Sequence, residues 1–279
     1  MDRYALIGHP VEHSKSPLIH AAFARQTRQE LDYQALLAPL DGFSDTVRMF
    51  RAEGGRGANI TVPFKIEACS LATRLTERAK LAGAVNTFAF MDDAIVGDNT
   101  DGIGLVRDLI VNLACPLAGR HVLLLGAGGA ARGVLFPLFQ TKPVSLTIAN
   151  RTVERAQELR AAFVHHAGQT AFTAGSFKDL GGWEFDVVIN ATSASLENEA
   201  LPLPKNILSP DAFAYDMMYG TGDTPFLAWA RAAGVARYSD GLGMLVEQAA
   251  ECFTLWRGVR PNSASVLSKL RRKLASDDD

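Results

Sequence analysis

Short runs of β-favouring residues alternate with helix-length amphipathic segments along the chain. The first part holds predicted strands at residues 4–7, 33–37 and 57–61. Helices are predicted at residues 17–26, at 42–50 and from residue 64 onward. A hairpin of strands 85–90 and 94–96, joined across Met91-Asp92-Asp93, follows them. This alternation is typical of an α/β fold.

The same alternation restarts after Asp101. A helix predicted over 102–112 precedes the continuously apolar strand 122–125, and continuous apolarity indicates burial on both faces. Further strands are predicted at 146–149 and 187–189, with helices at 130–139, 152–163 and 227–233. Two more helices, 242–256 and 263–274, end the pattern. The sequence therefore predicts a second α/β unit.

Composition narrows the possible partners and the compartment. The chain has 279 residues, 48% of them hydrophobic, and a formal net charge of −2, so we expect no nucleic acid and no membrane as partner. Apolar runs stop short of the roughly 20 residues of a membrane helix. Cys69, Cys115 and Cys252 are odd in number and far apart, which disfavours disulfides and fits a reducing cytoplasm. The six histidines have no metal-ligand spacing, so we expect no metal.

A glycine-rich segment, Gly126-Ala127-Gly128-Gly129-Ala130-Ala131, directly follows the predicted buried strand and opens a helix. It matches G-x-G-x-x-A, in which glycines permit a tight turn and close approach of a pyrophosphate to free amides at the helix start. The alternative is a tight turn without a ligand. Its position in a βαβ unit favours a dinucleotide.

The end of the next strand bears on which dinucleotide is bound. Enzymes that use NAD place an acid there for the ribose, whereas this strand ends Asn150-Arg151-Thr152 without one. Arg151 and Arg155 are four residues apart, which predicts one shared face of the following helix. Two guanidinium groups suit a phosphate dianion and indicate NADP. The alternative is a solvated pair of surface arginines.

Two further segments carry candidate chemistry. In Asn59-Ile60-Thr61-Val62-Pro63-Phe64-Lys65, a lysine falls in the first turn of a helix, where the positive amide end disfavours it. Such a placement suggests general acid/base work, although an exposed lysine that reaches water is the alternative. In Gly97-Asp98-Asn99-Thr100-Asp101-Gly102, acids ordinarily serve turns and caps. Asp101 nevertheless falls where one α/β unit passes to the next, a common place for ligands.

Together these motifs closely resemble the shikimate dehydrogenase family, from Tyr4 almost to the carboxyl terminus. The segments that carry the resemblance are 8–17, 57–65, 83–87, 97–102, 126–130, 150–152, 216–219 and 240–243. Eight motifs in this order along one chain are highly specific for a single family.

The resemblance implies a two-domain α/β fold with a central cleft. A discontinuous α/β substrate domain would comprise residues 1–101, with 242–279 returning to it, and a Rossmann-type NADP-binding domain would comprise 102–241. The implied activity is the reversible, NADP-dependent reduction of 3-dehydroshikimate to shikimate in aromatic amino acid biosynthesis. We expect a monomer or homodimer.

The resemblance also assigns site residues. Lys65 and Asp101 match the family's catalytic pair. The residues that match its substrate contacts are Ser14, Ser16, Thr61, Lys65, Asn86, Asp101, Tyr219 and Gln248. The residues that match its cofactor contacts are Gly126, Ala127, Gly128, Gly129, Ala130, Asn150, Arg151, Thr152, Arg155, Met217 and Gly241.

Two alternatives and one departure accompany this interpretation. A quinate/shikimate dehydrogenase would share every motif, and a non-catalytic sensor of NADP and a metabolite is disfavoured by the presence of Lys65 and Asp101. The departure is Ser195, where the family usually has Gly. If that Gly needs a positive φ, Ser should strain a loop near the nicotinamide, so Ser195→Gly should alter turnover more than binding.

Overall fold

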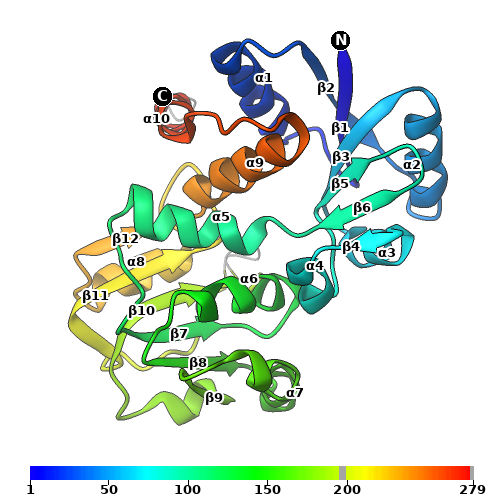
Figure 1. Ribbon diagram of the computed structural model, residues 1–279. Helices are drawn as coiled ribbons and strands as arrows, with labels where there is room; N and C mark the ends of the chain where they lie inside the picture. The colour runs from blue at the N-terminus through cyan, green and yellow to red at the C-terminus, as the bar shows by residue number, and fades with distance from the viewer. Residues whose placement is uncertain (195–198, 277–279) are drawn as a thin grey trace. The chain divides into compact units, whose positions relative to one another are not determined.

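Two six-stranded sheets organise the described part of the chain, residues 1–194 and 199–276, in this computed structural model (Figure 1). Each sheet belongs to its own compact unit. The first unit comprises Met1–Gly104 and Val246–Lys269, and the second comprises Leu105–Leu245 and the chain from Leu270. These divisions fall a few residues beyond the predicted 101/102 and 241/242, and they assign the end of the last helix to the second unit. Ser195 lies outside the described residues.

The sheet of the first unit is mixed. Its strand order is β2-β1-β3-β5-β6-β4, and the strands in chain order are β1 (Asp2–Gly8), β2 (Leu31–Leu37), β3 (Gly55–Ile60), β4 (Arg74–Leu75), β5 (Thr87–Phe90) and β6 (Ile95–Asp98). The first three pair in parallel, while β5 is antiparallel to both β3 and β6. The predicted hairpin at 85–96 is therefore confirmed.

Helices of the first unit pack on this sheet through a core of aliphatic and aromatic side chains. They are α1 (Ser16–Thr27), α2 (Phe43–Ala52), α3 (Lys65–Leu71), α4 (Glu77–Ala82), α9 (Leu242–Arg257) from Val246 onward, and the start of α10 (Ser263–Ser276). Phe43 of α2 stacks on Phe64 at 4.7 Å between ring centroids. Because Phe64 is buried in this core and immediately precedes α3, it fixes where Lys65 begins the helix.

The second unit has an all-parallel sheet with the order β12-β11-β10-β7-β8-β9. Its strands are β7 (His121–Leu125), β8 (Ser145–Asn150), β9 (Ala171–Ser176), β10 (Phe185–Asn190), β11 (Leu208–Asp216) and β12 (Arg237–Ser239). Numbered within the unit, the order is 6-5-4-1-2-3, which is the Rossmann order with its switch point between β7 and β10. Residues 122–125 are all 0% exposed, so the predicted doubly buried strand is confirmed as β7.

Helices cover this second sheet and complete the predicted α/β architecture. They are α6 (Gly129–Gln140), α7 (Val153–Phe163) and α8 (Pro225–Ala232), with short 3-10 turns at Val164–His166 and Phe177–Leu180. Helix α5 (Asp101–Arg107) begins in the first unit and continues, through the π-helical turn Asp108–Asn112, in the second. The predicted α/β class with two units is confirmed. No helix of the described residues has the length and apolarity needed to cross a membrane.

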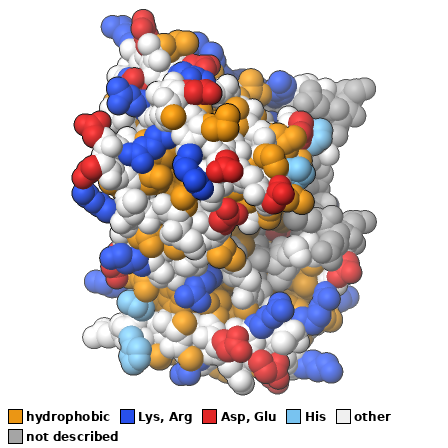
Figure 2. All heavy atoms as spheres, turned by 90° about the vertical axis from the view of Figure 1, so that its right-hand side faces the viewer, with side chains coloured by type: hydrophobic (Ala, Val, Ile, Leu, Met, Phe, Trp, Pro, Cys, Tyr) orange, Lys and Arg blue, Asp and Glu red, His pale blue; other side chains and the backbone are white. Residues whose placement is uncertain are grey.

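On the face drawn in Figure 2, Lys and Arg are interspersed with Asp and Glu.

Candidate functional site

Lys65 and Asp101 form an ion pair in the first unit. Lys65 Nζ donates to Asp101 Oδ2 at 2.7 Å, and the two side chains are 33% and 18% exposed. Each residue is the first of a helix, α3 and α5, so both side chains stand at helix starts. Lys65 is thus not a lysine that only reaches water. A proton-carrying amine lies against a carboxylate that can orient it.

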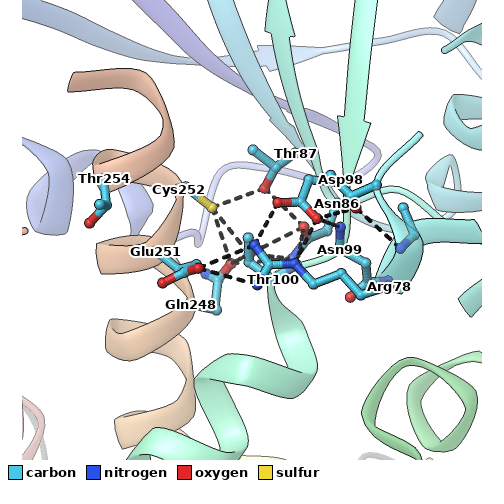
Figure 3. Close-up of polar contacts among 12 residues, drawn as sticks. Arg78, Asn86, Thr87, Asp98, Asn99, Thr100, Gln248, Glu251, Cys252 and Thr254 are labelled. Atoms are coloured by element: carbon cyan, nitrogen blue, oxygen red, sulfur yellow. Dashed lines mark hydrogen bonds and ion pairs between the residues drawn. The ribbon is translucent and has the colours of Figure 1, made fainter. Parts of the chain in front are cut away.

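Asn86 donates a hydrogen bond to the other oxygen of the Asp101 carboxylate. It lies just before β5, is buried, and its Nδ2 donates to Asp101 Oδ1 at 2.7 Å. The amide orientation is fixed because Asn86 Oδ1 accepts the backbone N–H of Thr100 at 2.9 Å. Gln248 Oε1, from α9, lies 3.4 Å from Asn86 Nδ2 and 3.3 Å from Thr100 Oγ1 (Figure 3). Segments distant in sequence therefore meet around Asp101.

The remaining predicted substrate contacts of the first unit lie beyond the carboxyl ends of two neighbouring parallel strands, β1 and β3. Ser14 Oγ accepts the backbone N–H of Ser16 at 3.2 Å, and Ser16 is buried at the start of α1. Thr61 directly follows β3 and donates its N–H to Ile7 at 3.0 Å. Three hydroxyl side chains are thus held on fixed backbone.

Tyr219 belongs to the second unit, three residues beyond β11. It is half-buried, and burial, with a smaller contribution from the charge of Asp240, raises the pKa of its phenol above the usual value. The group is therefore a neutral hydroxyl at neutral pH, able to donate or accept a hydrogen bond.

The glycine-rich turn lies at the switch point of the second sheet. Gly126 has φ +102°, and a Cβ there would lie 3.1 Å from the carbonyl oxygen of Ala191, which follows β10. Gly128 and Gly129 are exposed, with nothing within 4 Å of an added Cβ. Helix α6 begins at Gly129 without a side-chain cap, so its first amides are open to an anion. The site fits the pyrophosphate of a dinucleotide.

The residues predicted to distinguish NADP from NAD follow β8. Asn150 ends this strand, and its Nδ2 donates to the Thr152 carbonyl at 2.9 Å. Thr152 is the N-cap of α7, so Arg151 precedes the helix and only Arg155 lies on it. The predicted shared helix face is therefore wrong. Both arginines are exposed, and Arg151 pairs with Glu199 at 3.0 Å.

Met217 and Gly241 lie together in the second unit. The Met217 N–H donates to the Asn190 carbonyl at 2.9 Å, and the Gly241 N–H donates to the Met218 carbonyl at 2.9 Å. A Cβ on Gly241 would collide with the Met217 carbonyl, so only glycine fits there. Buried Asp216 supports the loop by accepting from Asn190 Nδ2 at 3.1 Å and from the Met218 N–H at 3.0 Å. Asp216 was not among the site residues predicted from the sequence.

A Rossmann-ordered parallel sheet with an open glycine turn at its switch point defines a dinucleotide-binding protein. The Lys65–Asp101 pair lies in a separate α/β unit, and a lysine beside a carboxylate is chemically suited to proton transfer. A dinucleotide-binding unit and such a pair in one chain are typical of a nicotinamide-dependent oxidoreductase. Among the residues described, no cluster of three or more His, Cys, Asp or Glu could hold a metal ion.

Three family models identify the particular family. They describe the shikimate dehydrogenase substrate binding domain over residues 6–88, shikimate / quinate 5-dehydrogenase over 109–198, and the shikimate 5'-dehydrogenase C-terminal domain over 241–271. The chain belongs to the shikimate dehydrogenase family, as predicted.

Relatives and solved structures agree with this assignment. The shikimate dehydrogenase (NADP(+)) of Aromatoleum aromaticum is 64% identical, with 98% of each chain covered. The Ael1 enzyme from Pseudomonas putida is 51% identical with a TM-score of 0.92, covering 97% of this chain and 98% of that one. Shikimate 5-dehydrogenase from Thermus thermophilus, in complex with NADP(H) and shikimate, is 32% identical with a TM-score of 0.85, covering 98% of this chain and 100% of that one.

Proposed function

We propose that this protein catalyses the reversible, NADP-dependent reduction of 3-dehydroshikimate to shikimate, a step of aromatic amino acid biosynthesis. The observation that carries the proposal is the carboxylate of Asp101, held by Lys65 on one oxygen and by Asn86 on the other. It stands in a chain that is 64% identical to a shikimate dehydrogenase (NADP(+)). The first unit is the proposed substrate domain and the second the NADP-binding domain.

The proposed substrate site matches the chemistry of shikimate. Shikimate carries one carboxylate and several hydroxyls on a small ring. The proposed contacts are mainly neutral hydrogen-bonding side chains: Ser14, Ser16, Thr61, Asn86, Tyr219 and Gln248, with Lys65 and Asp101 beside them. Such a site rejects an analogue that lacks a hydroxyl, because a polar partner is then left unpaired.

Lys65 is the proposed proton-transfer residue. In the direction of reduction, the Lys65 ammonium gives a proton to the ketone oxygen of 3-dehydroshikimate as the carbon receives a hydride. In the reverse direction, the amine takes the hydroxyl proton of shikimate. Asp101 holds Lys65 Nζ at 2.7 Å and so orients it toward the reacting oxygen. NADPH supplies the hydride when it is bound.

The cofactor contacts are proposed on the second unit. The backbone from Gly126 to Ala130 would bind the pyrophosphate, and Arg151 and Arg155 the additional phosphate of NADP. Neighbouring contacts are proposed at Asn150, Thr152, Met217 and Gly241. The three free cysteines among the described residues suit a reducing compartment, so we propose the cytoplasm, with the enzyme as a monomer or homodimer.

The proposal is tested by following the formation of reduced nicotinamide when the purified protein is mixed with NADP and shikimate. NAD and quinate replace each partner in parallel reactions, and Lys65→Ala serves as the catalytically impaired control. We expect turnover that needs shikimate and prefers NADP. Equal turnover of quinate would identify a quinate/shikimate dehydrogenase, and binding of both ligands without any turnover would identify a sensor.

A further inference from the structure

Arg78, the second residue of α4, lies between two carboxylates of the first unit. Its Nε and Nη2 donate to Asp98 Oδ1 and Oδ2 at 2.7 and 2.6 Å, the two-pronged geometry of a strong ion pair. Nη1 and Nη2 both lie 3.2 Å from Glu251 Oε1 on α9. Figure 3 shows Arg78 reaching toward Asp98, with Glu251 on the facing helix. One guanidinium therefore joins the end of β6 to α9.

The ion pairs continue along α9. Glu251 Oε2 accepts from Arg260 Nη1 at 2.9 Å, and Arg260 Nη2 donates to Glu247 Oε2 at 2.7 Å. Asp98 and Glu247 are both about 1% exposed, so loss of either arginine would leave a buried carboxylate poorly compensated. We call Arg78, Asp98, Glu251, Arg260 and Glu247 the Arg78 network.

The network ends on the residues that hold the proposed substrate contacts. Asp98 Oδ1 accepts the N–H of Asn99 at 2.7 Å, and Asn99 Oδ1 accepts the N–H of Asp101 at 3.2 Å. On the other side, Gln248 lies on α9 between Glu247 and Glu251. The Arg78 network thus binds both segments that meet at the site, the 98–101 turn through Asp98 and α9 through Glu251.

The distances from Gln248 to Thr100 and Asn86 depend on how the Arg78 network holds α9 against the 98–101 turn. Gln248 Oε1 lies 3.3 Å from Thr100 Oγ1 and 3.4 Å from Asn86 Nδ2, near the upper limit for a hydrogen bond. A shift of α9 by a few tenths of an ångström away from the turn would break both contacts. Burial alone would raise the pKa of Asp98, but the Arg78 hydrogen bonds and charge outweigh it and lower this pKa. The Arg78–Asp98 pair is therefore charged at neutral pH.

We infer that Arg78 is a positioning residue for substrate binding: by fixing the 98–101 turn against α9, it places Asn86, Asp101 and Gln248 to receive shikimate. This inference rests on the proposed function. Arg78 itself makes no proposed contact with the substrate. The cofactor contacts of Gly126 to Ala130 belong to the other unit, so the role predicts a loss confined to shikimate.

The test uses Arg78→Lys and Glu251→Gln in the full-length protein. Lysine keeps a cation beside buried Asp98 but lacks the fork that reaches both carboxylates, and glutamine keeps the shape of Glu251 without its charge. The matched control is Arg74→Lys, because Arg74 forms an exposed ion pair with Asp93 in the same unit, with the two side chains 63% and 79% exposed. For each variant, KM for shikimate, KM for NADP, kcat, thermal unfolding and calorimetric binding of shikimate are measured.

We expect the two network variants to weaken shikimate binding and to raise its KM by about 3- to 30-fold, a usual range for coupled contacts. KM for NADP and all constants of Arg74→Lys should stay within about twofold of the wild type. Wild-type affinity for shikimate in both network variants would overturn the inference. So would an equal loss of NADP and shikimate affinity together with lower thermal stability, because Arg78 would then be purely structural. Absence of turnover by the wild type would instead reject the proposed function, and calorimetry would still test Arg78.

Discussion

The two proposed binding regions differ in what they offer a ligand. In the first unit, buried Asn86 and partly buried Lys65 and Asp101 are linked by hydrogen bonds of 2.7 Å. In the second unit, the glycine turn offers bare backbone, and Gly128 has nothing within 4 Å of an added Cβ. The first region thus offers oriented, charged side chains, whereas the second offers open space and free backbone amides. Substitutions should therefore impair ligand binding or turnover for different physical reasons in the two regions.

The largest effect is expected from Asp101→Asn, which keeps the shape of the side chain and removes the charge that holds Lys65. Loss of positioned acid/base chemistry should lower kcat/KM for shikimate by about 10² to 10⁴-fold. NADP affinity should stay unchanged. Steady-state kinetics with both substrates check this, with Asp93→Asn, whose side chain is 79% exposed, as the control. A variant that lost NADP binding equally would contradict the separation of the two regions.

The next largest effects are expected in the glycine turn, where Gly126→Ala and Gly128→Ala should distinguish a loss of folding stability from a loss of NADP affinity. Gly126→Ala forces a side chain to φ +102° and against Ala191, so it should cost about 1 to 3 kcal/mol of stability and also weaken NADP binding. Gly128→Ala has open space, so its stability should stay within about 0.5 kcal/mol of the wild type while the methyl group obstructs the pyrophosphate. Thermal unfolding and NADP titration distinguish the two. Undiminished NADP affinity in both variants would place the pyrophosphate elsewhere.

A smaller effect is expected at the exposed arginines. Charge-assisted hydrogen bonds contribute about 1.5 to 3 kcal/mol each, and exposure should bring Arg151 and Arg155 toward the lower end. The double change to Ala should therefore remove most of the preference for NADP over NAD. The ratio of kcat/KM for the two cofactors measures it. A ratio equal to that of the wild type would reject both residues as phosphate ligands.

The smallest effect is expected at Glu199, whose ion pair with Arg151 would compete with the phosphate that Arg151 is proposed to bind. With the side chains 73% and 50% exposed, this pair is weak. Glu199→Gln should raise NADP affinity by about 1.5- to 5-fold, and the gain should shrink at high salt. NAD, which lacks the phosphate, is the internal control. An equal gain with NAD would mean that Glu199 acts on something other than the phosphate.

The sequence predicted the interior of the fold better than its margins. Strand β7 was predictable because residues 122–125 are continuously apolar, and a strand buried on both faces needs that pattern. Strands β4, β9, β11 and β12 were missed. β12 has three residues, two of them exposed, and β11 contains Pro210 and Asp211, so their pairing is supplied by neighbouring strands and not by local pattern.

The proposed site was predictable where short motifs carry it. Lys65, Asp101 and the glycine turn lie in such motifs. The Arg78 network was not predictable, because Arg78 meets Asp98 across 20 residues and Glu251 across 173. Arg151 was expected on a helix, but the helix begins after Thr152. Contacts that depend on tertiary packing leave no periodic signal in the chain.

The pH dependence of turnover in the wild type and in Lys65→Ala, with equilibrium binding of shikimate measured alongside, tests the central claim most directly. Positioned proton transfer contributes about 10² to 10⁴-fold, so Lys65→Ala should lose about that much turnover and also the pH-dependent step of the wild type. Shikimate binding should weaken far less, because only one hydrogen-bonding partner is lost. Near-normal turnover with an unchanged pH profile would contradict the account and move proton transfer to another group, first to Asp101.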